Sequence, residues 1–364
     1  MELFGRNWDR EELRQHVGSM QQLAGIEPAR LVNGAARDVE VLNVRTGSGL
    51  NYQVVPGRGL DIGLCEYQGF PLAWLSPTGT VHASFFDAVG RGWLRGFAGG
   101  LLTTCGLTYV GGPTVDNGEE LGLHGRASYT PAQNVQWDAF WQGDRYFLEV
   151  RGQVRETGVF GPNVLLERRI CSELGSRDVF VFDTVTNEGY QAVPHMFLYH
   201  LNIGFPIVSG NSFLRADYSS VVPRDEVSQA GLSDFPALIE PVAEDMDQVF
   251  YLDTIPDADG MITVKIFNPT LRDGQGLGIA VSYLKTELPE LTIWRSLSRG
   301  RYLIGIEPGN CRVDGRDIER ARGTLVTLQP GEQASYAICL RVISAEDDAD
   351  PDVLPALVKR SLVG

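Results

Sequence analysis

The sequence predicts an all-β fold, a sandwich or barrel with one short helix near the N-terminus. Short apolar or alternating runs recur along most of the chain, as strands do when one face is buried. The 42 glycines and 19 prolines supply turns between these runs. A chain of 364 residues can bury one large core, and no repeat or linker divides it. We expect a main domain over 38–345, an N-terminal helical extension over 1–37 and a C-terminal tail over 346–364.

The first segment carries the clearest helix signal. Asp9 and Glu12 fit a capping box, and apolar residues then recur at helical spacing as far as Leu23. We therefore expect a helix over 9–23 that forms a lid or brace at the edge of the fold.

After residue 38 the apolar runs become short, which is typical of strands. The stretch Ile207–Val249 mixes prolines, acidic residues and serines and is expected to form long loops. The tail is acidic and then apolar, and we expect it to end in a short helix. The predicted strands span residues 39–44, 51–55, 61–64, 70–75, 135–141, 146–154, 164–171, 179–186, 261–267, 277–283, 291–294, 302–306, 323–328 and 335–342.

Composition argues against several kinds of partner. The formal net charge of -15 repels nucleic acid and anionic membranes, so we expect neither as a partner. The chain does not open with a basic segment followed by an apolar run, and no stretch approaches ~18 apolar residues. The 5 cysteines are far apart and form no CxxC pair, as in reduced proteins of the cytoplasm. We expect a cytoplasmic protein and leave its oligomeric state open.

A carboxylate is predicted at the end of an apolar strand in Arg301–Asn310. Side chains alternate along a strand, which places Gly305 and Glu307 on one face. Pro308 and Gly309 are expected to end the strand, because proline has no N–H donor and glycine favours turns. Glu307 is therefore a candidate catalytic base, although the strand alone fits an exposed glutamate before a turn better.

Histidines supply the other half of a candidate acid/base pair. In Leu121–Arg126, His124 and Arg126 lie two residues apart and share a side if the segment is extended, so both could hold oxygens of a polyol. His195 and His200 are five positions apart, an odd spacing that places them on opposite faces of a regular strand. We expect only one of these two rings to line a given pocket.

A carboxylate and an imidazole can act together as general base and general acid near pH 7. Sugar anomerisation needs such a pair. One group takes the proton of the anomeric hydroxyl, the other protonates the ring oxygen, the ring opens, the aldehyde turns and closure reverses the roles. The glycine-rich stretch Gly96–Leu102 does not match a phosphate-binding loop, and no nucleotide fingerprint is present. We expect no cofactor and no metal.

Several short motifs follow one another in a set order along the chain. They are Leu123-His124-Gly125, Thr186–Gly189 leading into Pro194 and His200, Leu291–Trp294, Gly305–Pro308 and Leu328–Glu332. In this order they resemble the aldose 1-epimerase (galactose mutarotase) superfamily, from about Val39 to Val342. More narrowly, Gly57–Gly63, Phe97–Leu107 and Gly122–Arg126 look like an uncharacterised branch of mutarotase-like proteins.

This resemblance implies a β-supersandwich fold that binds a small-molecule carbohydrate on the concave face of a sheet. It implies that Glu307, in the Glu-Pro motif, is the base and that His200 is the acid, with His195 as the alternative. It also implies that His124, in Leu-His-Gly, orients the substrate.

The sequence departs from the family at one point. Mutarotases commonly carry an Asn-Arg pair shortly before Leu-His-Gly, whereas this chain has Thr103–Thr108 there. A sugar-binding arginine must then come from elsewhere, and Arg58, Arg95 and Arg126 are the candidates. The departure leaves both the substrate and the reaction open.

Two further side chains are candidate substrate ligands. Asn202 could bind a hydroxyl, and the ring of Trp294 could stack on a pyranose. Roles within the scaffold explain both residues as well, and Arg58 fits a turn with a surface ion pair to Asp61 about equally.

Two other kinds of function stay open at this stage. A noncatalytic carbohydrate-binding protein could keep the same pocket. A metal-dependent sugar isomerase or lyase could use three imidazoles and a carboxylate as metal ligands, namely His124, His195, His200 and Glu307.

Overall fold

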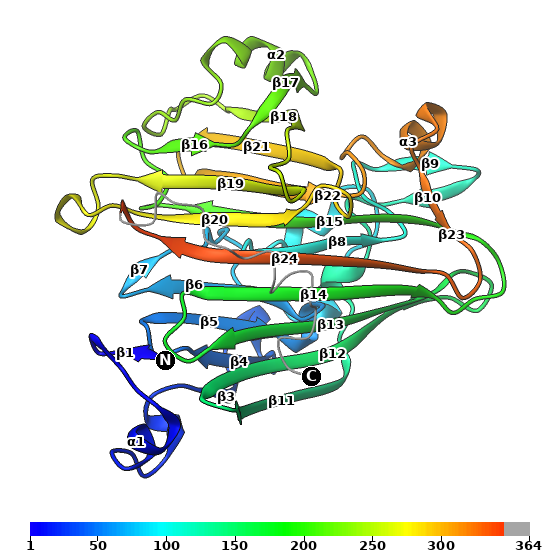
Figure 1. Ribbon diagram of the computed structural model, residues 1–364. Coiled ribbons are helices and arrows are strands. Elements are labelled where there is room, and N and C mark those ends of the chain that lie inside the picture. The colour runs from blue at the N-terminus through cyan, green and yellow to red at the C-terminus, as the bar shows by residue number, and fades with distance from the viewer. Residues whose placement is uncertain (346–364) are drawn as a thin grey trace.

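Two β-sheets carry the fold of residues 1–345, the part of the chain that the computed structural model describes. Figure 1 looks onto the smaller sheet, with the larger sheet behind it. The prediction of an all-β fold is confirmed. In spatial order the smaller sheet consists of β11 (Gln133–Gln142), β12 (Arg145–Thr157), β13 (Asn163–Glu173), β14 (Asp178–Asn187), β24 (Gln333–Ile343), β20 (Leu277–Leu284), β19 (Met261–Asn268) and β16 (Phe213–Arg215).

The larger sheet holds the strands that matter for function. Its neighbouring strands run antiparallel. In spatial order it consists of β17 (Tyr218–Pro223), β18 (Asp247–Thr254), β21 (Glu290–Ser298), β22 (Arg301–Gly309), β15 (Val193–Gly204), β8 (Leu102–Leu107), β6 (Asp61–Tyr67), β5 (Leu50–Val55), β4 (Glu40–Arg45) and β3 (Gly25–Arg30), with β23 (Val326–Leu328) on β15 and β7 (Phe70–Pro71) on β6.

Both faces of the larger sheet are apolar, and each packs against a different layer. One face joins the smaller sheet in the main core, to which β15 contributes Tyr199 and Leu201. The other face forms a second buried cluster, to which β15 contributes Leu198. Because successive side chains of a strand point to opposite sides, His200 lies on the face of Leu198, away from the main core.

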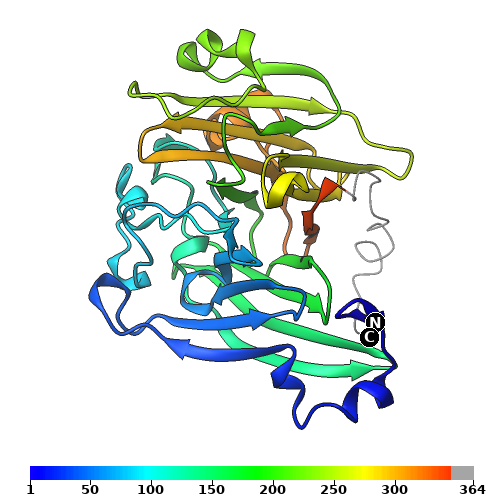
Figure 2. The same ribbon diagram turned by 90° about the vertical axis from the view of Figure 1, so that its left-hand side faces the viewer.

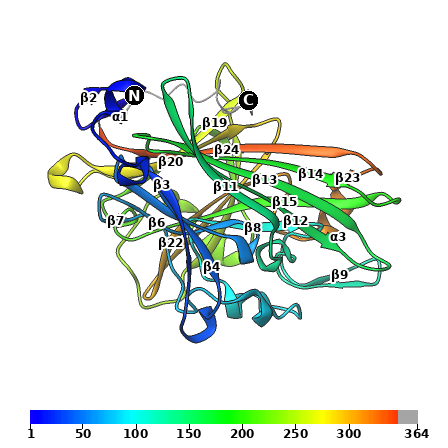
Figure 3. The ribbon, with the colours of Figure 1, turned by 90° about the horizontal axis from the view of Figure 1, so that it is seen from below.

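Loops and short 3-10 helices cover this second face. Trp93, Phe97 and Tyr129 from these loops pack in the same cluster as Leu198. Figure 3 shows the cyan part of the chain beyond the larger sheet, on the side away from β24. The 3-10 helices of this layer are η3 (Pro56–Arg58), η4 (Ala83–Phe85), η5 (Gly92–Gly96) and η6 (Ala127–Tyr129).

The N-terminal helix is shorter than its spacing predicts. Asp9 caps α1 (Arg10–Arg14) by accepting a 2.7 Å hydrogen bond from the Glu12 amide, but Gly18 and a separate 3-10 turn, η1 (Met20–Gln22), follow instead of a continuous helix. The helix lies at the end of the molecule opposite α2 (Glu226–Ala230) (Figure 2).

The boundary predicted at residue 37 is also wrong, because β3 pairs with β4 and so belongs to the larger sheet. A two-stranded hairpin of β1 (Glu2–Leu3) and β2 (Arg6–Asn7) precedes α1. The predicted C-terminal tail lies outside the described residues.

The stretch predicted as loops between residues 207 and 249 contains β16, β17 and α2, together with η7 (Leu232–Asp234). The hairpin of β9 (Thr114–Asp116) and β10 (Glu119–Leu121) packs beside α3 (Arg316–Arg322), where Arg316 and Arg320 both pair with Asp116 at 2.7 Å. The remaining 3-10 turns are η2 (Gly34–Ala36) and η8 (Arg272–Gly274).

The strand that carries Glu307 does not end where the sequence predicts. β22 continues through Pro308, which lies opposite Leu291, to Gly309, which lies opposite both Glu290 and Leu198. A proline removes only its own donor, and the neighbouring strands β21 and β15 hold the segment from both sides.

No helix within residues 1–345 is long and apolar enough to cross a lipid bilayer. All 5 cysteines are buried and unpaired as free thiols.

Candidate functional site

His200 and Glu307 lie side by side on neighbouring strands. β15 and β22 are paired so that Leu201 lies opposite Ile306, and the same register sets His200 opposite Glu307. Nε2 of His200 is 3.3 Å from Oε1 of Glu307, and both side chains are buried. Directly opposite side chains on antiparallel strands share a face, so strand pairing alone brings these two groups together.

Gly305 makes room for the acid. A Cβ atom at this position would lie 2.6 Å from Oε1 of Glu307 and 3.0 Å from Cβ of Trp294. Gly305 and Glu307 therefore lie on the same face of β22, as expected. The absence of a side chain at Gly305 leaves room for the Glu307 carboxyl group.

His124 reaches the pair from a loop. Its φ of 56° is left-handed, and its backbone is fixed by hydrogen bonds from its N–H to Gly111 O at 2.9 Å and from Gly106 N–H to its carbonyl at 3.2 Å. The centre of its ring lies 6.0 Å from that of His200 and 5.1 Å from that of Trp93. The loop and the sheet thus bring two imidazoles and one carboxyl group into a single cluster.

Buried side-chain polar atoms that lack a hydrogen-bond partner are concentrated at this cluster. Elsewhere in residues 1–345 only Tyr283 and Asp317 carry such an atom. Native proteins leave few buried polar atoms unpaired, so their concentration here indicates a place for a ligand with several hydrogen-bonding groups. The unpaired atoms of the site are Oε1 of Glu307, Nδ1 of His200, Nδ1 of His124, Oδ1 of Asn202 and Oγ1 of Thr292, which lies directly opposite Glu307.

Aromatic rings frame the cluster. The rings of Phe97 and Trp294 lie 5.3 Å and 5.5 Å from His200, and the ring of Trp74 lies 6.0 Å from Phe97 and 6.3 Å from Trp294. Trp74 and Trp294 are each partly exposed, and Nε1 of Trp294 donates a hydrogen bond to Asp247. Partly exposed rings of this kind can stack on the apolar face of a sugar.

Burial sets the protonation of the central pair. It raises the pKa of the Glu307 carboxyl to about 8, with Arg224 opposing the rise and Asp247 adding to it. It lowers the pKa of His200 to about 4, and the nearby Asn202 side chain opposes this shift. Between these two values the pair holds one proton, which rests on Glu307. Transfer of that proton to His200 would give a carboxylate base and an imidazolium acid.

Two of the predicted ligands lie away from this cluster. His195 points between the sheets, where Nδ1 contacts Leu107 O at 2.9 Å and Nε2 contacts the Tyr336 hydroxyl at 2.8 Å. His195 and His200 are thus on opposite faces of β15, as their spacing predicts. Arg58 is buried, and its guanidinium donates to three backbone carbonyl groups, those of Ser128, Val81 and Gly96. These contacts hold both side chains within the scaffold.

His195 also lies apart from the other three residues considered as metal ligands, His124, His200 and Glu307. Its two ring nitrogens are engaged on the far side of the sheet. Among residues 1–345 no three His, Cys, Asp or Glu side chains are arranged to hold a metal ion.

The other predicted ligands divide into two groups. Asn202 lies on the face of His200 and donates to Gly100 O at 3.0 Å and to His200 O at 3.1 Å, which leaves its own oxygen unpaired. Trp294 lies in the aromatic frame. Arg95 is largely exposed and pairs with Asp87 at 3.3 Å, and Arg126 is also exposed.

Sequence reasoning missed several residues of the site. Thr292 is two residues before Trp294 and therefore shares its face, which the strand period could have revealed. Asp247 and Arg224 come from the stretch read as loops, and only the pairing of β17 with β18 and of β18 with β21 brings them near the cluster. Trp74 carried no signal of its own.

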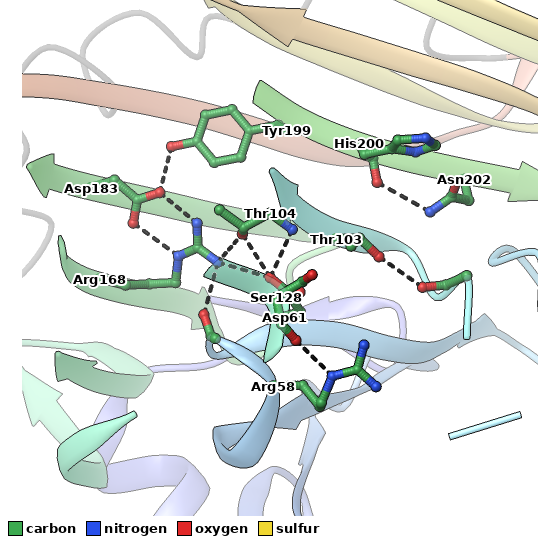
Figure 4. Close-up of polar contacts among 12 residues, drawn as sticks. Arg58, Asp61, Thr103, Thr104, Ser128, Arg168, Asp183, Tyr199, His200 and Asn202 are labelled. Carbon is green, nitrogen blue, oxygen red and sulfur yellow. Dashed lines mark hydrogen bonds and ion pairs between the residues drawn. The ribbon is translucent and has the colours of Figure 1, made fainter. Parts of the chain in front are cut away.

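The opposite face of β15 carries a polar cluster of another kind (Figure 4). Arg168 donates to both carboxylate oxygens of Asp183, at 2.9 and 2.7 Å, and to the Thr104 hydroxyl at 2.7 Å. Asp61 lies 3.3 Å from Arg168 and accepts two hydrogen bonds from Thr104, at 3.0 and 2.6 Å. The Tyr199 hydroxyl donates to Asp183 at 2.7 Å.

We call these five residues the buried ionic network. It joins β13 and β14 of the smaller sheet to β6, β8 and β15 of the larger one. Tyr199 pairs with Thr104 in the register that also pairs His200 with Thr103. The network therefore holds the strand position next to His200. Burial raises the pKa of Asp61 to about 6 although Arg168 opposes the rise.

Comparisons with known proteins agree with this architecture. The family model described as a domain of unknown function, DUF4432, matches residues 36–342. No curated protein matches the sequence. Among solved structures, a candidate aldose 1-epimerase from Klebsiella pneumoniae has a TM-score of 0.82 and 26% identity, over 87% of this chain and 83% of that chain.

Two more distant structures share the fold. A galactose mutarotase-like protein from Clostridium acetobutylicum has a TM-score of 0.61 at 14% identity, over 89% of this chain and 99% of that one. A galactose 1-epimerase from Lactobacillus acidophilus has a TM-score of 0.56 at 13% identity, over 88% and 99%. The chain therefore belongs to the DUF4432 family, and its fold is the β-supersandwich of galactose mutarotase-like proteins, as its motifs imply.

Proposed function

We propose that this protein is an aldose 1-epimerase-like isomerase that interconverts the anomers of a sugar or sugar derivative without a cofactor. The observation that carries the proposal is the 3.3 Å contact between His200 and Glu307 within the cluster of unpaired polar atoms. The likeness to the Klebsiella protein, which is described as a candidate aldose 1-epimerase, supports the same reaction class.

In the proposed mechanism Glu307 is the base and His200 is the acid. The Glu307 carboxylate takes the proton of the anomeric hydroxyl while His200 protonates the ring oxygen, and the ring opens to the aldehyde. Rotation of the aldehyde and closure with the roles reversed give the other anomer. The two sugar oxygens are bonded to the same carbon atom, so the acid and base must lie close together, as these two side chains do.

The surrounding groups would hold the sugar. The unpaired oxygens of Asn202 and Thr292 can accept hydrogen bonds from hydroxyl groups. Trp74 and Trp294 provide apolar faces for the ring. Nδ1 of His124 is unpaired and buried, and it can orient a hydroxyl close to His200.

Anomer exchange on a panel of sugars, measured by NMR, tests the reaction. We expect Glu307→Gln and His200→Ala each to lower kcat/KM by about 100- to 10,000-fold, the usual contribution of a general acid or base. Glu40→Gln is the matched control, because Glu40 lies in an exposed pair with Arg30, and it should keep the parent rate. If both site variants also keep the parent rate, the assigned roles are wrong. Sugar binding by calorimetry with no acceleration would instead favour a noncatalytic carbohydrate-binding protein.

The pH dependence gives a second test. The active form of the pair holds one proton, so kcat/KM should be bell-shaped, with limbs near pH 4 and pH 8. At low pH both groups are protonated and no base is left, and at high pH both are deprotonated and no acid is left. A single-limbed profile that rises without a fall above pH 8 would contradict the shared proton.

A further inference from the structure

Two arginines that the sequence did not single out lie near His124. The first is Arg91, which is exposed and makes no ion pair within residues 1–345. The residue before it, Gly90, accepts a 3.0 Å hydrogen bond from the Leu123 amide. Two residues after it, the Trp93 ring contacts the ring of His124 at 5.1 Å. Arg91 is therefore anchored on both sides to the loop that presents His124.

The second is Arg224, which directly follows β17. Its amide donates to Val249 O at 3.0 Å, in line with the pairing of Pro223 and Phe250 one residue earlier. Its side chain therefore leaves the backbone on the face of Val249, which lies opposite Trp294. Val249 and Trp294 both belong to the cluster on the His200 face of the sheet.

These arginines make one end of the site positive. Burial lowers the pKa of His124 to about 3, and His200, Arg224 and Arg91 all shift it in the same direction, with no carboxylate opposing them. At Glu307 the charges are mixed, since Arg224 lowers the pKa and Asp247 raises it. The positive end of the site is thus at His124, and the Asp247 side is less favourable for an anion.

The arginines can be released to a ligand. Arg224 pairs with Asp225 at 2.9 Å, but both side chains are exposed by more than a third. Exposed ion pairs of this kind contribute little to stability. An incoming anion can therefore replace Asp225 at little cost, and Asp225 keeps its separate hydrogen bonds to Ser228 at the start of α2.

We infer that the substrate is a sugar carrying an anionic group, a carboxylate or a phosphate monoester, and that Arg91 and Arg224 bind this group at the His124 end of the site. The inference rests on the proposed sugar reaction and specifies its substrate class. A net charge of -15 repels an anionic sugar at long range. Two arginines at the site offset that repulsion locally.

The test compares three kinds of sugar at the intact protein: galactose and glucose, the corresponding uronic acids, and glucose 6-phosphate. Anomer exchange is followed by NMR, and binding is measured separately by calorimetry. We expect kcat/KM to be at least about 10-fold higher for one of the anionic sugars than for the neutral ones, because a charged hydrogen bond contributes about 1.5–3 kcal/mol. The two anionic arms distinguish a carboxylate from a phosphate.

The variants Arg91→Gln and Arg224→Gln should each raise KM for the anionic sugar about 10-fold or more, and by a larger factor than for the neutral sugars. Arg215→Gln, on β16 of the other sheet, removes the same charge and should have no such selective effect. Equal losses on charged and neutral sugars, or a preference of the parent for neutral sugars in both assays, would overturn the inference. If no sugar is interconverted at all, the proposed reaction fails, and tighter calorimetric binding of the anionic sugars still decides this inference.

Discussion

The two faces of β15 carry polar clusters that differ in how completely their groups are paired. Between the sheets, the buried ionic network surrounds the fully buried Arg168 side chain with carboxylate, hydroxyl and carbonyl oxygens. On the other face, one residue along, His200 and Glu307 each keep an unpaired buried atom. A buried unpaired polar group costs about 1–3 kcal/mol. Most of the unpaired buried atoms lie on this second face. The first cluster is therefore assigned to stability, and we propose that the second binds the ligand.

The largest effect should come from breaking the paired cluster. Arg168→Leu leaves Asp183 and Asp61 buried without their cation, and the loss of one partner of a buried pair costs about 3–5 kcal/mol. The free energy of unfolding, measured by urea denaturation, should fall by this amount. Arg30→Leu, which removes an exposed partner of Glu40, should cost about 1 kcal/mol or less. Equal losses in the two variants would show that the network does not stabilise the fold.

At the cluster around His200 and Glu307, removing a buried group should raise the stability of the fold as the pH increases, rather than lower it. The pKa of Glu307 rises from 4.5 to about 8 on folding, so the folded state is favoured below pH 4.5 and loses that advantage as the pH rises towards 8. Glu307→Gln has no such group. Its stability relative to the parent should therefore increase between pH 5 and pH 8, by up to about 1.4 kcal/mol per pH unit.

Thermal unfolding of parent and variant across that pH range measures this difference. His200 titrates in both proteins, so its opposite dependence largely cancels. The exposed Glu40→Gln is the control and should show a constant difference from the parent. A constant difference for Glu307→Gln as well would mean that the carboxyl group is not held protonated by burial.

A smaller effect should follow from filling the space beside the acid. In Gly305→Ala the new methyl group meets Oε1 of Glu307 and Cβ of Trp294, and overpacking of this kind costs about 1–3 kcal/mol. The displaced carboxyl group should also lower kcat/KM, because small misplacements of catalytic groups cost about 100-fold. Gly18→Ala, at a position with open space, should change neither quantity. Unchanged activity in Gly305→Ala would show that the position of Glu307 does not matter.

The smallest effect should come from the Tyr199 hydroxyl, which joins β15 to the buried ionic network. Tyr199→Phe removes one hydrogen bond to Asp183, whose oxygens still accept from Arg168. We expect a loss of about 0.5–1.5 kcal/mol in stability and a kcat/KM within a few-fold of the parent. A loss of activity as large as that of Glu307→Gln would instead mean that the network sets the position of His200.

The sequence was informative wherever one strand carries the signal. The alternation of side chains along one strand predicts that Gly305 and Glu307 share a face. It also predicts that His195 and His200 lie on opposite faces, and both predictions agree with the structure. What a single strand cannot reveal is its neighbours. Arg224 and Asp247 reach the site only because β17, β18 and β21 pair in a particular register, and no local pattern encodes a register between distant segments.

Arginine roles were the least predictable part of the site. Arg58 looked like a surface turn residue or a sugar ligand, yet it is buried against backbone carbonyls. No sequence pattern marks Arg168, yet its side chain joins the two sheets. A guanidinium group can bind a ligand or hold the scaffold together, and only the tertiary structure decides which carbonyl or carboxylate groups surround it.

The place of β3 has a practical consequence for work with shortened chains. This strand forms one end of the larger sheet and, within residues 1–345, pairs only with β4. It lies entirely before residue 36, where the family match begins. A polypeptide trimmed to the matched boundaries would expose the backbone groups of β4 as a new edge, ready to pair with another molecule. Material prepared for crystals or assays should therefore start upstream of Gly25, or aggregation could be mistaken for inactivity.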